Sequence, residues 1–193
     1  IITDLKKRGN NIIVVTSAMQ GITDKLLNYT KQFVVNSYEN SYYRECDAEV
    51  SCGESIAAGI LSLALQSEGI MAKSFNSWQI PIEASTNYSN ATITNVNTKL
   101  LFDAISDNII PVVTGFQGLT KNNDIVTLGR GGSDATACAL AYYTNADECY
   151  IYTDVSGVFT ADPRVVTNAK LLKYVSYDEM IELAKYGAKV LQY

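Results

Sequence analysis

Short runs of consecutive apolar, mostly β-branched residues recur along the chain and predict buried strands. Residues 11–16 and 109–114 are continuous runs of this kind, typical of strands covered on both faces of a parallel sheet. Residues 70–75 and 148–153 predict two more strands. Apolar residues at helical spacing predict helices at 25–35, 56–66 and 96–107, and in the alanine-rich run after Ser133. Strands alternating with helices predict an α/β fold, a three-layer αβα sandwich with a mostly parallel central sheet, in one domain.

Polar segments between these elements predict the connections. Residues 37–47 are polar and rich in tyrosine, and we expect a surface loop or the edge of a lid there. Residues 77–88 predict another loop, and 121–124 a turn that leads into a short strand at 125–127. Ser176 and Glu179 have the spacing of a capping box, which predicts a helix that begins there and ends at Gly187.

The glycine-rich stretch Thr127–Asp134 is the strongest candidate for a binding site. Three of its residues, at 129, 131 and 132, are glycines, which let backbone N–H groups come close to a ligand. The following helix, with Ser133 as its expected N-cap and Asp134 in its first turn, would point its N-terminal N–H groups at an anion. Arg130 adds a planar cation suited to a carboxylate or a phosphate. A simple turn before a capped helix is the alternative.

Composition narrows the chemistry. The 193 residues carry a net charge of −5, which speaks against nucleic acid as a partner. We find no apolar run of membrane-spanning length and no signal segment, so we expect a cytoplasmic protein with no membrane partner. The four cysteines lack metal-site spacing and predict buried free thiols. The chain has no histidine, which excludes Ser-His-Asp hydrolysis and histidine-ligated metals.

Small, polar or charged residues follow the predicted strands, where doubly wound sheets bind their ligands. Ser17, residues 114–116, Thr153 and Asp154 are in such positions, together with the glycine-rich stretch. No Walker-type phosphate loop is present. Phosphoryl transfer to a carboxylate needs positioning and charge neutralisation and no general base, so a pocket without histidine is compatible with it. Arg130, Arg164 and Lys189, together with magnesium, would supply the positive charge.

Six motifs in the same order resemble the aspartate kinases, members of the amino-acid kinase family. They cover nearly the whole chain: VTSAMQGITD at 15–24, SCGE at 51–54, TGFQG at 114–118, TLGRGGSD at 127–134, TDVSGVFTADPR at 153–164 and YGAKVL at 186–191. The resemblance implies an αβα sandwich that uses ATP and Mg²⁺ to phosphorylate the β-carboxylate of L-aspartate, on the route to lysine, threonine and methionine. It also implies a homo-oligomer.

The resemblance assigns roles to individual residues. Arg130 would bind the α-carboxylate of aspartate and Glu54 its ammonium group, whereas Ser17 and Thr23 would lie near the acceptor carboxylate. Ser133 and Asp134 would organise the catalytic centre. The nucleotide would be framed by Thr153, Asp154, Phe159 and Arg164, and Lys189 would meet its phosphates. The sequence identifies no direct metal ligand. Taken singly, Glu54 is also explained as a helix-start acid, Asp154 as a turn former and Lys189 as a solvated lysine.

Two departures from the family pattern keep alternatives open. The family's N-terminal Lys-Phe-Gly-Gly-Thr-Ser strand is missing, since residues 1–9 already look like the last turns of a helix, and no regulatory ACT region follows Tyr193. We therefore expect a catalytic domain trimmed at both ends. The alternatives are another amino-acid kinase, acting on glutamate, acetylglutamate or uridylate, or an inactive nucleotide-binding or assembly fragment. Phe159 stands where the family often has tyrosine.

Overall fold

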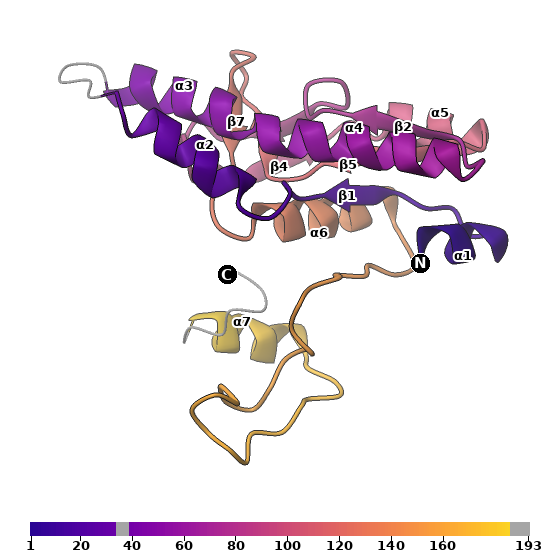
Figure 1. The fold of residues 1–193 in the computed structure, drawn as a ribbon, viewed down its shortest axis with the longest axis vertical. Helices are drawn as coiled ribbons and strands as arrows, with labels where there is room; N and C mark the ends of the chain where they lie inside the picture. Colours follow the sequence, from indigo (N-terminus) through magenta and orange to yellow (C-terminus); the bar gives the residue numbers. More distant parts are fainter. Residues whose placement is uncertain (34–38, 186–193) are drawn as a thin grey trace. The chain divides into compact units, whose positions relative to one another are not determined.

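The computed structural model describes residues 1–33 and 39–185 (Figure 1). It divides into two compact units, residues 1–149 and 150–193. The single domain expected from the sequence stays a prediction.

A three-stranded parallel sheet forms the centre of the first unit. Its strands β1 (Val14–Thr16), β2 (Ala72–Phe75) and β5 (Ile110–Thr114) are ordered β1-β5-β2. All five residues of β5 are buried, as its apolar run predicts. β1 is also formed as predicted, but Val14 and Val15 are only half-buried. The reason is its place at the edge, where it pairs with β5 alone in the described chain.

Helices cover both faces of this sheet, because successive side chains of a strand point in opposite directions. Val112 packs in a cluster with Ala58 and Leu65 of α4 (Cys52–Ser67). Val113, the next residue, packs instead with Leu101 of α5 (Lys99–Ser106) and Leu140 of α6 (Gly132–Thr144). Figure 1 shows α4 and α6 on opposite sides of β1. The predicted three-layer αβα arrangement is confirmed, and Ile2 of the short α1 (Ile2–Lys7) packs against the cluster that contains Val112.

A second, mixed sheet extends the first unit. Its strands are β3 (Ile82–Ala84), β4 (Ile93–Val96), β6 (Gln117–Leu119) and β7 (Ile125–Thr127), in the order β4-β3-β6-β7. β6 and β7 form the antiparallel hairpin expected around residues 121–124. β3 lies within 77–88, which the sequence predicted as a loop. Pro81 and the polar residues elsewhere in 77–88 favoured a loop, but a strand forms here, with Ile82 and Ala84 buried.

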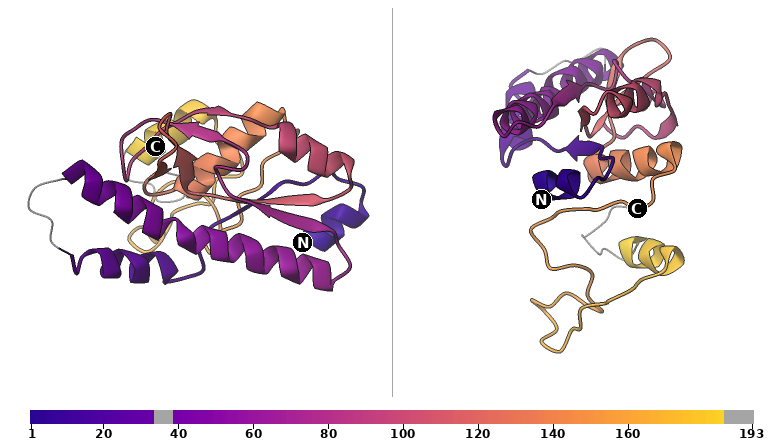
Figure 2. Two further views of the ribbon diagram at one scale, coloured as in Figure 1. Left: turned by 90° about the horizontal axis from the view of Figure 1, so that it is seen from above. Right: turned by 90° about the vertical axis from the view of Figure 1, so that its right-hand side faces the viewer.

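The prediction of a loop at 37–47 is wrong, because residues 39–50 form the helix α3 (Glu39–Val50). Tertiary contacts override its polar composition. Cys46 and Val50 are buried, and the hydroxyl of Tyr42 donates a hydrogen bond of 3.0 Å to the carbonyl of Thr30 at the end of α2 (Ile22–Thr30). Seen from above, α3 and α4 follow one another as one long helical run beside the sheet (Figure 2).

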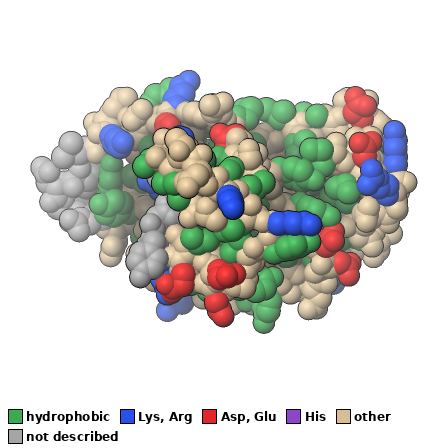
Figure 3. Space-filling model, turned by 90° about the horizontal axis from the view of Figure 1, so that it is seen from below, with side chains coloured by type: hydrophobic (Ala, Val, Ile, Leu, Met, Phe, Trp, Pro, Cys, Tyr) green, Lys and Arg blue, Asp and Glu red, His purple; other side chains and the backbone are tan. Residues whose placement is uncertain are grey.

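This run, Asn40–Ser67, is long and apolar enough to cross a membrane by length and composition alone. That differs from the expectation that no segment reaches this length. One such run is weak evidence for a membrane span, because the core helices of soluble proteins can be equally long and apolar. In this structure α4 packs its buried face against the sheet. Figure 3, seen from below, does not draw the side on which Figure 1 has α3 and α4; on the face that it draws, acidic and basic side chains are interspersed among apolar ones.

All four cysteines are free, as predicted, but only Cys46 is buried. Cys52, Cys138 and Cys149 are exposed because they lie on the outward sides of helices or, for Cys149, in an irregular segment.

The second unit is mostly irregular. The strand expected at 148–153 is not formed, and Tyr150 and Tyr152 are largely exposed. Aromatic and β-branched composition makes a strand only where a neighbouring strand completes the ladder. The capping box is confirmed: the hydroxyl and N–H of Ser176 both bond the Glu179 carboxylate at the start of α7 (Tyr177–Lys185). Its expected end, Gly187, lies outside the described residues.

Candidate active site

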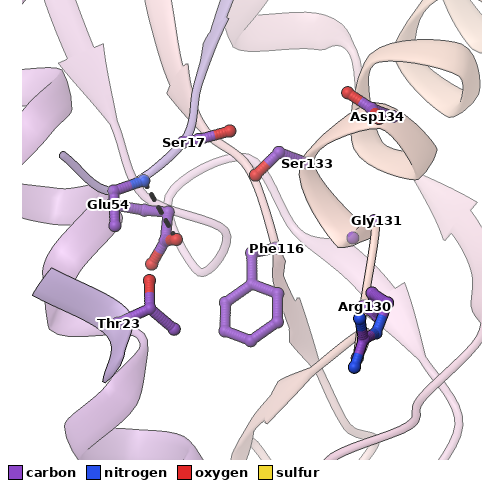
Figure 4. A pocket seen from close by; sticks show the side chains of 11 residues that line it. Ser17, Thr23, Glu54, Phe116, Arg130, Gly131, Ser133 and Asp134 are labelled. Carbon is purple, nitrogen blue, oxygen red and sulfur yellow. Dashed lines mark hydrogen bonds between the residues drawn. The ribbon is translucent and has the colours of Figure 1, made fainter. Parts of the chain in front are cut away.

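A pocket of about 260 Å³ lies in the first unit, next to the end of β1 and the start of α6 (Figure 4). It contains six of the seven residues that the resemblance assigned to the acceptor and the catalytic centre. The seventh, Lys189, lies outside the described residues. Its lining consists of Ser17, Ala18, Thr23, Glu54, Phe116, Gly129, Arg130, Gly131, Gly132, Ser133 and Asp134. Residues up to 117 positions apart in sequence are thus brought together, from Ser17 to Asp134.

Glu54 forms one wall of the pocket and has an unusual environment. It lies in the first turn of α4 and is only 3% exposed. One carboxylate oxygen, Oε1, accepts a hydrogen bond of 3.1 Å from the N–H of Ala18. The other, Oε2, is buried and has no hydrogen-bond partner within residues 1–33 and 39–185. Burial raises the pKa of this carboxyl, although the bond from Ala18 opposes the shift. A buried carboxylate oxygen without a partner is costly, and a ligand ammonium would satisfy it.

The opposite wall is the glycine-rich loop. Gly129 and Gly131 have φ of +75° and +73°, a conformation that residues with a side chain rarely adopt. The expectation that Ser133 is the N-cap is wrong. Gly131 occupies that position and no side chain caps the helix, because the chain enters it in the left-handed conformation. The Ser133 hydroxyl is therefore available to the pocket, and Figure 4 shows it pointing inwards.

Arg130 and Asp134 differ in exposure. Arg130 is exposed at the rim, across the pocket from Glu54 (Figure 4). Asp134 lies in the first turn of α6, as predicted, and is half-buried. Burial raises its pKa as well. The guanidinium of Arg130 thus lies on one side of the pocket and the buried carboxyl of Glu54 on the other. These two groups match the carboxylate and the ammonium group of an α-amino acid.

Two features of the pocket had no individual role from the sequence, although Phe116 was among the candidate residues that follow a strand. The N–H of Ala18 holds Glu54, and backbone groups leave no signal of this kind in a sequence. Phe116 lines the floor with φ +66°, and its N–H bonds the hydroxyl of Thr136 at 3.2 Å. A phenylalanine in this conformation is strained, which the motif TGFQG did not reveal.

The nucleotide candidates belong to the second unit. Thr153 and Asp154 are exposed, and the Thr153 hydroxyl donates to Asp154 at 3.4 Å. Phe159 is half-buried and forms an isolated bridge with Leu171. Arg164 makes two side-chain bonds to Asp162, at 2.8 and 3.0 Å, and this carboxylate raises the pKa of the guanidinium. Lys189 lies outside the described residues.

Comparison with known proteins places the chain in a family. The sequence profile of the amino acid kinase family matches residues 1–192. The chain belongs to the amino acid kinase family. Among curated relatives of this family, the aspartokinase of Rickettsia bellii is 47% identical over 95% of the chain, and aspartokinase 2 of Bacillus subtilis is 46% identical over 96%. The chain spans about 45% of the length of each of these relatives.

Solved structures support the same fold. The aspartate kinase of Synechocystis is 39% identical over 98% of the chain, with a TM-score of 0.77, and the chain covers 31% of it. Aspartokinase III of Escherichia coli, solved with aspartate and ADP, matches with a TM-score of 0.84 at 24% identity, over 98% of this chain and 53% of that one. The amino-acid kinase fold predicted from the sequence is therefore confirmed.

Proposed function

We propose that this member of the amino acid kinase family phosphorylates the β-carboxylate of L-aspartate, with ATP as the phosphoryl donor. The observation that carries the proposal is the buried Oε2 of Glu54, which has no hydrogen-bond partner among the described residues, in a small pocket that Arg130 also lines. The aspartokinase names of relatives at 46–47% identity support the same substrate.

In this proposal the residues of the pocket bind different groups of the substrate. Arg130 offers two parallel N–H donors to the α-carboxylate, and Glu54 receives the ammonium group, so the substrate is oriented with its side chain directed along the remaining wall. Ser17, Thr23 and Ser133 supply hydroxyl groups for the acceptor carboxylate. This carboxylate is ionised at neutral pH and attacks without a general base, so the task of the protein is to position it and neutralise charge.

Thr153, Asp154, Phe159, Arg164 and Lys189 are proposed to hold the nucleotide, with Lys189 and Asp134 acting at the catalytic centre. In residues 1–33 and 39–185, no three His, Cys, Asp or Glu side chains gather to hold a metal ion. The donor set fits a magnesium ion carried mainly by the phosphates, with Asp134 as an available oxygen, since Mg²⁺ keeps waters and uses few protein ligands. When bound, Mg²⁺ would offset the negative charge of the phosphates.

The test of substrate choice is trapping of the acyl phosphate as a hydroxamate. We expect product from L-aspartate, and at least about tenfold lower kcat/KM for N-acetyl-L-aspartate, because acetylation removes the charge that Glu54 requires. If the protein instead phosphorylates acetylglutamate, glutamate or a nucleoside monophosphate faster than aspartate, it has another activity of the family. Nucleotide binding without any transfer would favour a non-catalytic role.

Arg130→Lys is expected to raise the KM for L-aspartate about tenfold, which corresponds to roughly 1.4 kcal/mol, and to leave the KM for ATP nearly unchanged. Lysine offers a point charge where the carboxylate expects two parallel donors. Steady-state kinetics with each substrate varied in turn measures both values. Equal defects for aspartate and ATP would place Arg130 in the nucleotide site instead.

A further inference from the structure

Asp47, outside the pocket, is a buried carboxylate with an unusually complete set of hydrogen bonds. It lies on α3 and is 2% exposed. Its Oδ2 accepts the backbone N–H of Ser89 at 2.7 Å and that of Thr127 at 2.8 Å. Its Oδ1 accepts the hydroxyl groups of the same two residues, at 2.9 and 3.0 Å. Four bonds to a single buried carboxylate fix two otherwise separate segments to α3.

Both segments support the loop that carries Arg130. Thr127 is the last residue of β7 and lies three positions before Arg130. Ser89 belongs to the loop between β3 and β4, and this loop touches the base of the glycine-rich stretch: a Cβ on Gly129 would lie 3.0 Å from the carbonyl of Ser89. The carbonyl of Thr127 also accepts the N–H of Ala91 at 3.0 Å. Asp47 therefore anchors the Arg130 wall of the pocket from behind.

The same residue is connected to the Glu54 wall. Asp47 precedes Glu54 by seven positions, about two turns of helix. Its carbonyl accepts the N–H of Ser51 at 3.1 Å, at the junction where α3 passes into α4 (Figure 2). The carbonyl of Ser51 in turn accepts a bond of 2.6 Å from the side-chain amide of Gln117, which is fully buried. A displacement of Thr127, at the base of the Arg130 loop, relative to the start of α4 would have to break these bonds.

We propose that Asp47 is a positioning residue that sets the separation between Arg130 and Glu54, and through it the length of the amino-acid acceptor. The inference deepens the proposed function and rests on it for the identity of the acceptor. The anchoring itself rests only on the four hydrogen bonds. The separation matters because both charged ends of an α-amino acid must be bound while its side-chain carboxylate reaches the phosphoryl group.

Two substitutions separate anchoring from charge. Asp47→Ala removes all four acceptor contacts and leaves the N–H of the buried Thr127, and that of the exposed Ser89, without this acceptor. Asp47→Asn keeps the shape. Its carbonyl can take the place of Oδ2 and accept both N–H groups, and its NH₂ can donate to the two hydroxyl groups, which rotate to accept. Leu101→Ala is the matched control, because it removes a fully buried side chain of α5 that does not line the pocket.

The kinetic test uses the complete gene product, assayed where each variant is folded. We expect Asp47→Ala to raise the KM for L-aspartate at least about fivefold and to raise kcat/KM for L-glutamate relative to L-aspartate, with the KM for ATP within about twofold of wild type. Asp47→Asn and Leu101→Ala should keep wild-type selectivity. Equal selectivity in Asp47→Ala and wild type, or the same change in Leu101→Ala, would overturn the proposal.

Hydrogen–deuterium exchange of the unliganded protein tests the anchoring without reference to substrate. Amides of residues 127–132 should exchange faster in Asp47→Ala than in Asp47→Asn or Leu101→Ala. Unchanged protection in Asp47→Ala would overturn the anchoring even if the enzyme phosphorylates aspartate. Failure of the wild type to use aspartate would instead overturn the proposed function, and the exchange data would still decide the anchoring.

Discussion

Glu54→Gln is expected to raise the KM for L-aspartate at least about 30-fold and, at the same time, to make the unliganded protein more resistant to heat. The kinetic loss follows from the neutral amide, which cannot form an ion pair with the ammonium group of a ligand in the pocket. The gain in stability follows from Oε2, since a buried charge without a partner costs more than a neutral group of the same shape. Steady-state kinetics and thermal unfolding without ligand measure the two effects.

The difference in stability between Glu54→Gln and the wild type should depend on pH in a definite direction. Burial raises the pKa of the Glu54 carboxyl in the folded state. The folded protein therefore binds this proton more tightly than the unfolded chain, and the wild type gains stability as the pH falls through the raised pKa, completely so below the unfolded pKa. Glutamine does not titrate. The advantage of Glu54→Gln should thus be largest at neutral pH and shrink on acidification, whereas a gap that widens in acid would contradict the unpartnered carboxylate.

Gly115→Ala is expected to lower kcat at least about 100-fold, the scale of loss that a displacement of about 1 Å causes at a catalytic centre. A Cβ at this position would lie 2.7 Å from Oγ, 2.8 Å from Cβ and 2.9 Å from Cα of Ser133. Backbone cannot rotate away as a side chain can, so the first turn of α6, with Ser133 and Asp134, must shift. We also expect a stability loss of about 1–3 kcal/mol.

Gly59→Ala is the matched control for this substitution. Gly59 lies inside α4, and a Cβ there would meet nothing within 4 Å. Alanine is favoured over glycine in a helix interior by about 0.5–1 kcal/mol, so the melting temperature should rise by about 1–4 °C with kinetics unchanged. Wild-type activity in Gly115→Ala would mean that the start of α6 has no part in catalysis.

The sequence predicted those parts of the fold whose local pattern and tertiary environment agree. The run at 109–114 became the fully buried β5 because an all-apolar β-branched segment has few alternatives to a central parallel strand. The polar segment that contains Tyr42 became α3 because buried contacts at Cys46, Asp47 and Val50 decide its conformation. Contacts of this kind depend on segments far away in the chain, so no local pattern reports them.

In the pocket, too, the sequence identified the residues that motifs carry and missed those that depend on distant contacts. Arg130, Glu54 and Ser17 were identifiable because motifs of a known family carry them, and the structure brings them together. Asp47 was not identifiable, since its four partners come from residues 42 and 80 positions away. The sequence also gave no sign that Gly131 would replace Ser133 as the N-cap, because serine is the commoner residue there and the left-handed entry is a property of the loop.

The order of the parallel sheet has a consequence for synthesis of the protein. The central strand β5 is the last of the three along the chain, and Val14 of β1 pairs with Val112, about 100 residues later. At about 5–20 residues per second on the ribosome, β1 waits roughly 5–20 s before its partner has been made. During this time its apolar side chains and open backbone edge are exposed to other nascent chains. Chaperone demand should therefore end abruptly once Ile110–Thr114 has left the ribosome.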